Sequence, residues 1–113
     1  MKHLRPLLVL LIGTIGVTAC LPQSTVSSHH DDPFLVCVRQ HESGGNYSID
    51  NPNGLYHGAY QFLRSTWDAT AQHAGRSNLV GVDPHHASVV DQDEMAWALY
   101  QWQGKAPWYG SGC

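Results

Sequence analysis

The sequence predicts a small, mainly α-helical (α+β) domain that carries a short hairpin or irregular insert. Apolar side chains recur at intervals of three and four residues in three separate segments, which is typical of amphipathic helices packed on a core. Residues 46–63 lack this period and contain many Asn, Tyr and Gly residues. With 113 residues, the chain is long enough for one domain.

The N-terminal residues predict an export signal outside the domain. Lys2 and Arg5 give a positive start, and residues 7–17 form an apolar run. This run is too short to cross a bilayer, which needs about 20 residues. It is followed by VTAC, which resembles the bacterial lipoprotein box, where the signal is cut before the cysteine and its sulfur carries lipid. We therefore expect residues 1–19 to be removed and Cys20 to be lipidated; the alternative is ordinary cleavage nearby, with Cys20 lost or left free.

The exported part of the chain is acidic. Loss of the signal removes two of the six Lys and Arg residues but none of the nine Asp and Glu residues. Nucleic-acid binding needs a basic face, and binding to a membrane surface needs a polybasic patch, so neither is expected. We expect a monomer without a cofactor, located in the cell envelope or secreted. Its contact with a membrane would be limited to a lipid anchor at Cys20.

Residues 20–32 are polar and rich in serine, and we interpret them as a flexible tether to a domain at 33–113. The tether ends in a cluster of side chains that metals can bind. Two adjacent histidines cannot readily share one rigid site, so we interpret the cluster as solvated linker. Its members are His29, His30, Asp31 and Asp32.

The first helix is expected to span Pro33 to Ser43. Asp32 is a good N-cap, and proline suits the first helical position. Gly44 and Gly45 follow, and glycine supplies the left-handed residue that ends many helices. One line along this helix carries Leu35, Val38 and Glu42.

The insert contains a turn signal, NPNG, at 51–54. We expect short strands on either side of it, around Tyr47–Asp50 and Leu55–His57, which would pair as a small hairpin.

The second helix is expected to begin near Ser65, because Asp68 three residues later resembles the partner in a capping box. Gly75 would end this helix. Its expected inner face carries Trp67, Thr70, Ala71 and Ala74.

The third helical segment is expected to begin at Asp83, with a second start near Asp91, where DQDE is typical of an acidic first turn. Gly104 would end it, and 105–113 are expected to form a loop. Its expected stripe carries Met95, Ala98, Leu99 and Trp102.

Cys37 and Cys113 remain as a pair if Cys20 is an anchor, and export favours a disulfide between them. Such a bridge would tie the first helix to the last residue. Closing so long a loop would contribute on the order of 4 kcal/mol, less any strain. The alternative is two unrelated buried thiols.

Glu42 is the residue whose position points to chemistry. A carboxylate on an apolar line is partly desolvated, and one at a helix C-terminus faces the negative end of the dipole. Both effects raise its pKa, and an acid that stays protonated near neutral pH can donate a proton to a leaving oxygen. The alternative is a solvated glutamate at a helix end.

HESGGNYSIDNPNG, followed by GAYQF and STW, resembles the lysozyme-like transglycosylase domain of resuscitation-promoting factors, and more distantly the lytic transglycosylases. The resemblance covers roughly residues 34–113 and is strongest over 41–67. It implies a small lysozyme-like fold, peptidoglycan glycan strands as substrate and partner, and Glu42 as the catalytic acid. The bond cleaved would join N-acetylmuramic acid to N-acetylglucosamine, by hydrolysis or with an anhydro sugar as product.

Two departures from the family are visible. His41 stands where the family usually has cysteine, and Cys37 lies one helical turn earlier on the same face, so the bridge to the C-terminal cysteine could survive the shift. LYHGAYQF carries an extra residue and bulkier side chains before the glutamine. This change favours the alternative of a catalytically weak or inactive cell-wall-binding lipoprotein.

Asp50 is the candidate for a second catalytic carboxylate, since glycosidases usually use two. The alternative is a turn-forming aspartate, with Glu42 acting as both acid and base. Gln61, which matches the family's Gln-Phe step, and Tyr60 and Tyr56 are the candidates for sugar contacts. No metal site is expected, and we interpret the remaining histidines as surface or satisfied groups: His57, His73, His85 and His86.

Overall fold

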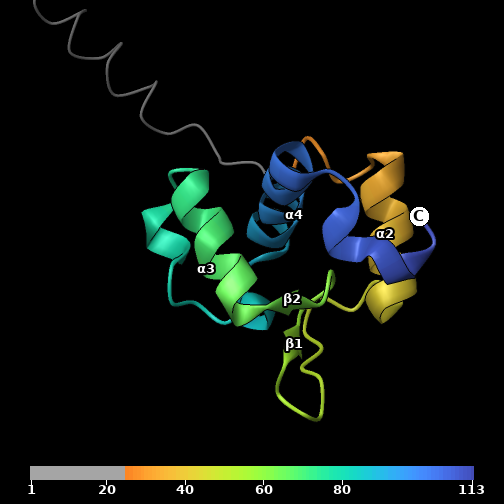
Figure 1. Ribbon diagram of the computed structural model, residues 1–113, viewed down its shortest axis with the longest axis horizontal. Helices are drawn as coiled ribbons and strands as arrows, with labels where there is room; N and C mark the ends of the chain where they lie inside the picture. The colour runs from red at the N-terminus through yellow and green to blue at the C-terminus, as the bar shows by residue number, and fades with distance from the viewer. Residues whose placement is uncertain (1–24) are drawn as a thin grey trace, which may run out of the picture.

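The computed structural model describes residues 25–113 and shows a mainly helical domain with one small sheet (Figure 1). The predicted fold class, a small lysozyme-like α+β domain, is confirmed. Within residues 25–113 the α-helices are α2 (Pro33–Ser43), α3 (Arg64–His73) and α4 (Val89–Gln103). The sheet pairs β1 (Tyr56–His57) with β2 (Phe62–Leu63), and the 3-10 helices are η1 (Ser77–Leu79), η2 (Pro84–His86) and η3 (Ala106–Ser111).

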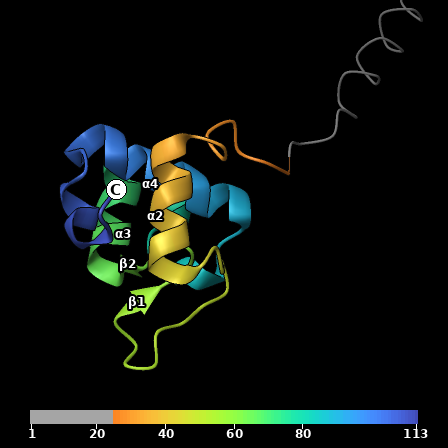
Figure 2. The same ribbon diagram turned by 90° about the vertical axis from the view of Figure 1, so that its right-hand side faces the viewer.

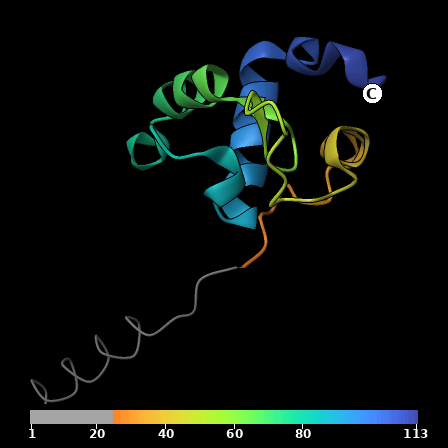
Figure 3. The ribbon, with the colours of Figure 1, turned by 90° about the horizontal axis from the view of Figure 1, so that it is seen from below.

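Helix α4 lies in the middle of the domain, between α3 on one side and α2 on the other (Figures 1 and 3). It contacts both helices and η3, so each of these elements buries its apolar face against α4. The loop 46–57 extends below the C-terminal end of α2 (Figure 2). The large apolar side chains of the core are Leu35, Tyr60, Phe62, Trp67, Met95, Leu99 and Trp108.

Helix α2 has the predicted bounds. The carboxylate of Asp32 accepts hydrogen bonds from the backbone N–H groups of Phe34 and Leu35, at 3.0 and 3.2 Å, which satisfies the free donors of the first turn. Gly44 ends the helix in the left-handed conformation, with φ 66°. Leu35 and Val38 are fully buried, as the apolar line predicts.

The predicted strand pairing is confirmed only in part. The chain does reverse at NPNG, where the Gly54 N–H donates to the carbonyl of Asn51. However, β1 pairs with β2 further along the chain, with Tyr56 opposite Leu63, and only a single bridge joins Asp50 to His57. Phe62 is buried against the core, so the regular pairing of β1 is with β2, while Asp50 forms a bridge to the same strand.

Helix α3 starts at Arg64, which confirms the predicted start near Ser65, but the expected capping box does not form. The N-cap position is held by Leu63, whose side chain has no acceptor, and Asp68 accepts a hydrogen bond from the Gly81 N–H. Helix α4 starts at Val89, where the Ser88 hydroxyl accepts from the Asp91 N–H. The start of this helix lies two residues before the predicted one, and Asp91 is part of its first turn, as the acidic pattern predicts.

The tail is not a plain loop. Residues 106–111 form η3, and the buried indole of Trp108 donates to the carbonyl of Tyr60 at 3.0 Å. Burial of this indole requires a hydrogen-bond acceptor for its N–H group. The expected loop is therefore replaced by a segment that is part of the core.

The end of the expected tether packs on α4. The ring of His29 stacks on Trp97 with centroids 4.1 Å apart, and Nδ1 of His30 lies 2.7 Å from Oδ2 of Asp93. The interpretation of these histidines as solvated is therefore wrong, while a domain boundary at residue 33 stays a prediction. The signal at 1–19 and the anchor at Cys20 lie outside the described residues. Within the described residues, no helix is both long and apolar enough to cross a membrane.

Candidate active site

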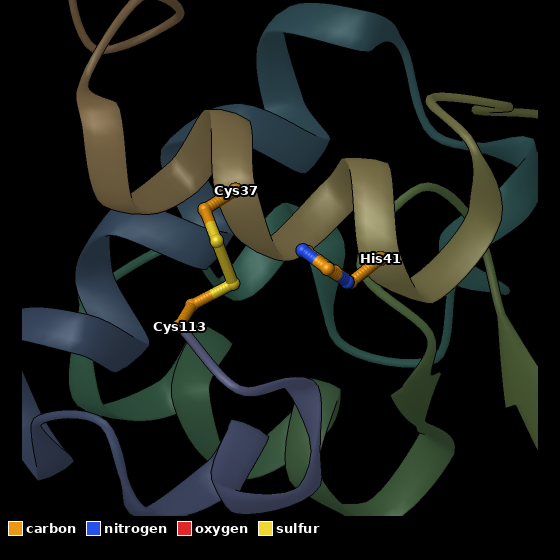
Figure 4. Close-up of side chains that lie close together, drawn as sticks. All are labelled: Cys37, His41 and Cys113. Atoms are coloured by element: carbon orange, nitrogen blue, oxygen red, sulfur yellow. A yellow bond between two sulfur atoms is a disulfide. The ribbon is translucent and has the colours of Figure 1, made fainter.

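A disulfide joins Cys37 of α2 to Cys113, across 76 positions of sequence (Figure 4). The predicted bridge is confirmed. His41 lies one turn later on the same side of α2 (Figure 4), so the bridge forms even though cysteine does not directly precede Glu42. The bridge holds the helix that carries Glu42 against the end of the chain.

Glu42 is the second-last residue of α2 and is half-buried. Burial raises the pKa of its carboxyl group above the ordinary value, and the neighbouring His41 lowers it in part. The predicted direction is confirmed. Among the described residues, no side chain forms a hydrogen bond or ion pair with the Glu42 carboxylate. Its proton is therefore not held by a neighbour.

The chain turns sharply after Glu42. Gly44 and Gly45 both have positive φ, 66° and 81°, and no atom of another residue lies closer than 3.8 Å to the position of a Cβ on either. Backbone without side chains is therefore open beside the carboxylate. This arrangement allows a bulky ligand to approach the end of α2.

Ser43 connects the end of α2 to the segment that follows β1. Its hydroxyl donates to the carbonyl of Ala59 at 2.7 Å and also lies within hydrogen-bonding distance of the Arg39 carbonyl. The next carbonyl, that of Tyr60, accepts from Trp108. Residues 59–60 are therefore fixed between α2 and η3.

A groove of about 240 Å³ is lined by residues that precede and follow this segment. It brings together two of the predicted sugar contacts, Tyr56 and Gln61, but Glu42 and Tyr60 do not line it. Its other walls are formed by Phe62, Leu63, Thr66, Leu99, Gln103, Pro107 and Trp108. A larger hollow of about 400 Å³ lies around the disulfide, where the carboxylate of Asp32 already caps α2, so we assign it no chemistry.

Gln61 has an unusual backbone conformation. Its φ is +53°, the only positive value at a non-glycine residue in the described part of the chain. Its side-chain amide donates to the Gly58 carbonyl at 3.0 Å, and its oxygen lies 3.5 Å from the amide nitrogen of Asn51. A left-handed non-glycine residue costs of order 1 kcal/mol or more and is concentrated at functional sites. The surrounding contacts hold Gln61 in this conformation at the groove.

Tyr60 is completely buried, which argues against the predicted sugar contact. Its hydroxyl donates to Asp93 at 2.6 Å and accepts from Arg39 at 3.0 Å. Because it offers no surface to a ligand, its role is in the core.

Comparison with known proteins identifies the family of this domain. Residues 31–111 match the family model described as "Transglycosylase-like domain". The chain belongs to this family. The predicted membership of the lysozyme-like transglycosylases is thus confirmed.

Curated relatives of this transglycosylase-like domain include "Probable transglycosylase SceD 3" of Staphylococcus saprophyticus and "Probable transglycosylase SceD" of Staphylococcus aureus strain Newman. Each is 39% identical over 82 residues, which is 73% of this chain. The aligned part is 33% and 34% of the two relatives, so the chain spans about a third of their length. No solved structure matches the chain significantly.

The transglycosylase-like domain contains a buried polar network that sequence reasoning missed. Asp93 is fully buried and accepts hydrogen bonds from the hydroxyls of Tyr47 and Tyr60, both at 2.6 Å. His30 and Arg39 also approach it, at 2.7 and 3.9 Å. Burial and the hydrogen bond to Asp93 raise the pKa of Tyr47 to about 12, so this hydroxyl stays a donor at neutral pH.

Gln92, beside Asp93 on α4, fixes the insert of the domain. Its side-chain oxygen accepts from the Ala59 N–H at 2.9 Å, and its amide donates to the carbonyls of Tyr47 and Ala87. Three segments are thus joined to one buried amide. The only sequence signal for a buried Gln92 is that DQDE continues the helical period of the core-facing residues. The interpretation of DQDE as an acidic first turn does not account for this burial.

Asp50 lies apart from Glu42 in the contacts of the domain. Its carboxylate is half-exposed and faces His57, with Oδ1 2.9 Å from Nδ1, and His85, with Oδ2 3.9 Å from Nε2. Its role as a second catalytic acid stays a prediction that these contacts do not support.

Proposed function

We propose that this domain cleaves the bond between N-acetylmuramic acid and N-acetylglucosamine in peptidoglycan glycan strands, with Glu42 as the general acid. The observation that carries the proposal is the Glu42 carboxyl group itself: it is half-buried, its pKa is raised, and it has no side-chain partner among residues 25–113. It lies at a glycine-flanked helix end in a member of the transglycosylase-like family.

The reaction needs one carboxyl group that first gives and then takes a proton. Protonated Glu42 donates its proton to the glycosidic oxygen as the bond to the anomeric carbon breaks. The resulting carboxylate then accepts a proton either from water or from the 6-hydroxyl of the muramic acid, and that oxygen forms the new bond to the anomeric carbon. Water gives hydrolysis, and the 6-hydroxyl gives an anhydro sugar. The names of the relatives favour the second product.

A mechanism with Glu42 as the single acid is favoured over one that includes Asp50. The Asp50 carboxylate faces two histidines rather than Glu42. Proton transfer by Glu42 in both directions needs no second carboxylate.

The glycan strand would run from the groove towards the end of α2. Tyr56 is 40% exposed and offers a ring on which a sugar can stack, and Gln61 offers an amide at the same groove. The bond between Ser43 and Ala59 connects this wall to the helix end beside Glu42. These contacts support Tyr56 and Gln61 as sugar-binding residues.

The substrate requires the domain to be outside the cytoplasm, which agrees with the predicted signal at 1–19. We propose that Cys20 carries the lipid that holds the domain at the membrane. Incorporation of labelled lipid tests this anchor: the label should be lost in Cys20→Ala, and a label that persists in this variant would rule Cys20 out.

The decisive experiment compares the two glutamates of the chain. Glu42→Gln should abolish clearing of purified peptidoglycan in a zymogram, while Glu94→Gln, on the surface of α4, should retain it. Mass spectrometry of the released fragments then distinguishes reducing ends from anhydro ends. Unchanged clearing by Glu42→Gln would remove Glu42 from the mechanism.

A wall-binding protein without turnover is the second candidate. It is favoured by the bulk of LYHGAYQF, which places Tyr60 in the core rather than at the groove. An unmodified protein that sediments with peptidoglycan but releases no fragments would select this candidate.

A further inference from the structure

Three potential metal ligands from separate segments converge on the side of the hairpin away from the groove. Asp50 precedes the NPNG turn, His57 is in β1, and His85 is in η2. One ligand atom from each lies within 4.8 Å of the others. The rings of His57 and His85 are nearly parallel, with centroids 5.3 Å apart.

The two histidines carry ring nitrogens that protein contacts leave unsatisfied. His57 is only 7% exposed, and its Nδ1 faces Asp50 at 2.9 Å. The direction of this contact does not suit a hydrogen bond, so Nδ1 is buried without a hydrogen-bond partner in the described part of the chain. Nδ1 of His85 is also buried without a hydrogen-bond partner among the described residues, whereas the nitrogen of this ring that faces Asp50 is Nε2. Buried polar atoms without partners are rare, and a bound ion is one of the few arrangements that satisfies them.

Other charged groups near the cluster are already engaged. Asp83 accepts from Arg64 at 2.7 Å, and Nδ1 of His86 lies 3.9 Å from the second oxygen of Asp83. This leaves a set of two imidazoles and one carboxylate. The carboxylate is half-exposed, so water can reach a fourth position.

We propose that Asp50, His57 and His85 form a binding site for a divalent transition metal of the zinc type. Two nitrogens and one carboxylate oxygen are ligands that Zn²⁺ accepts and that Mg²⁺ and Ca²⁺ do not prefer. Zinc bonds of about 2.0–2.2 Å in a tetrahedron put ligand atoms roughly 3.3 Å apart. The observed separations, 2.9 Å from His57 Nδ1 to Oδ1 and 3.9 Å from His85 Nε2 to Oδ2, involve different oxygens of Asp50, so rotation of this carboxylate and of the His85 ring would bring one atom from each residue to the required spacing.

The metal would fix the hairpin that carries the groove. Successive residues of a strand point to opposite faces, so Tyr56 faces the groove while its neighbour His57 faces the metal ligands. A metal at this site would join the turn, β1 and η2. This role is independent of whether Glu42 catalyses a reaction.

The test measures Zn²⁺ binding by isothermal titration calorimetry. It uses the metal-free, full-length protein with its disulfide intact. We expect one Zn²⁺ per chain and a higher melting temperature with Zn²⁺ but not with Mg²⁺. Asp50→Asn and His85→Asn should each weaken binding by at least about tenfold, since even indirect metal contacts are worth this much. His73→Asn, which alters a ring stacked on Trp102, is the matched control and should bind as the unmodified protein does.

Two further measurements distinguish metal binding at this site from binding at other histidines. Visible absorption of bound Co²⁺ should report nitrogen and oxygen ligands and should be lost in His85→Asn. Circular dichroism checks that each variant is folded, and Asp50→Asn changes a half-exposed side chain. No Zn²⁺ binding would overturn the proposal and leave an ion pair between Asp50 and His57. Binding that is unaffected by both Asp50→Asn and His85→Asn would place the metal elsewhere and also overturn it.

Discussion

Asp93 and Glu42 are both carboxylates withdrawn from water, but their surroundings differ. Asp93, in the middle of α4, is fully buried and has two tyrosine hydroxyls and a histidine nitrogen within 2.7 Å. Glu42, at the end of α2, is half-buried and has no such partner in the described part of the chain.

The difference indicates what each group can do. A carboxylate that accepts several hydrogen bonds is held in position by them. Removal of such a carboxylate leaves the donor groups unsatisfied. A carboxylate with a raised pKa and no partner contributes little to the fold but can exchange a proton with a ligand. We therefore assign stability to the Asp93 region and chemistry to the Glu42 region, and the predictions below test that division.

The largest effect is expected from Glu42→Gln. Loss of the general acid should lower the rate of peptidoglycan cleavage at least about a thousandfold, equivalent to about 4 kcal/mol of transition-state stabilisation. Release of soluble fragments from labelled peptidoglycan measures the rate. The melting temperature should stay close to that of the unmodified protein, and a large fall in it would contradict the division.

Asp93→Ala should show the opposite behaviour. Removal of this carboxylate leaves the hydroxyls of Tyr47 and Tyr60 without their acceptor and the Arg39 guanidinium, 3.9 Å away, without its counter-charge, and should lower the free energy of unfolding by about 3–4 kcal/mol. Urea denaturation measures the loss. Glu94→Ala, the next residue of α4 and partly exposed, is the control and should change stability by less than about 0.5 kcal/mol. Equal effects of the two substitutions would refute the structural role of Asp93.

Removal of the disulfide should destabilise the Glu42 helix without altering its chemistry. Cys37→Ser combined with Cys113→Ser opens a bridge across 76 positions and should cost about 2–4 kcal/mol. Denaturation with and without reductant checks this value, because reductant should destabilise the unmodified protein and not the double variant. Where the double variant is folded, its cleavage rate should be near that of the unmodified protein.

Gly58→Ala tests how firmly the insert is fixed to α4. A Cβ at this position would lie 2.4 Å from the side-chain oxygen of Gln92, whose hydrogen bonds hold it in place, and φ is +77°. We expect a loss of about 2–3 kcal/mol in thermal or urea unfolding. Gly54→Ala has a similar φ of +74° but no atom within 4 Å, so it isolates the backbone effect and should cost about 1 kcal/mol. Equal losses would mean that the Gln92 contact is not rigid.

The smallest effect concerns pH. The folded-state pKa of Glu42 is raised, so its contribution to stability is present at low pH and is lost as pH rises through that pKa. Glu42→Gln does not titrate, and it should therefore be more stable than the unmodified protein at pH 7 by a few tenths of a kcal/mol, because solvent screens a half-exposed group. The difference should vanish below about pH 4.

Unfolding at several pH values measures this difference, and a sign reversal would mean that Glu42 is stabilised as a carboxylate. The cleavage rate should also fall as pH rises through the same pKa, because the protonated acid is the reactive form. A rate that rises with pH over that range would contradict the assignment of Glu42 as proton donor.

The sequence by itself determined the features that depend on neighbouring residues. Asp32 and Gly44 set the bounds of α2 through local hydrogen bonds and a left-handed residue. The direction of the Glu42 pKa followed from its place on an apolar line at a helix end. The motif around Glu42 indicated the family, and the number of cysteines indicated the disulfide.

Only the tertiary structure decided which distant side chains meet. Local sequence patterns placed Tyr60 at the sugar groove, whereas the structure buries it and directs its hydroxyl hydrogen bond to Asp93. Strand pairing at β1 and the convergence of Asp50, His57 and His85 depend on contacts across as many as 35 positions, for which local preferences carry no information. Burial and partner geometry, rather than residue type, thus separate the carboxylate that holds the fold from the one available for chemistry.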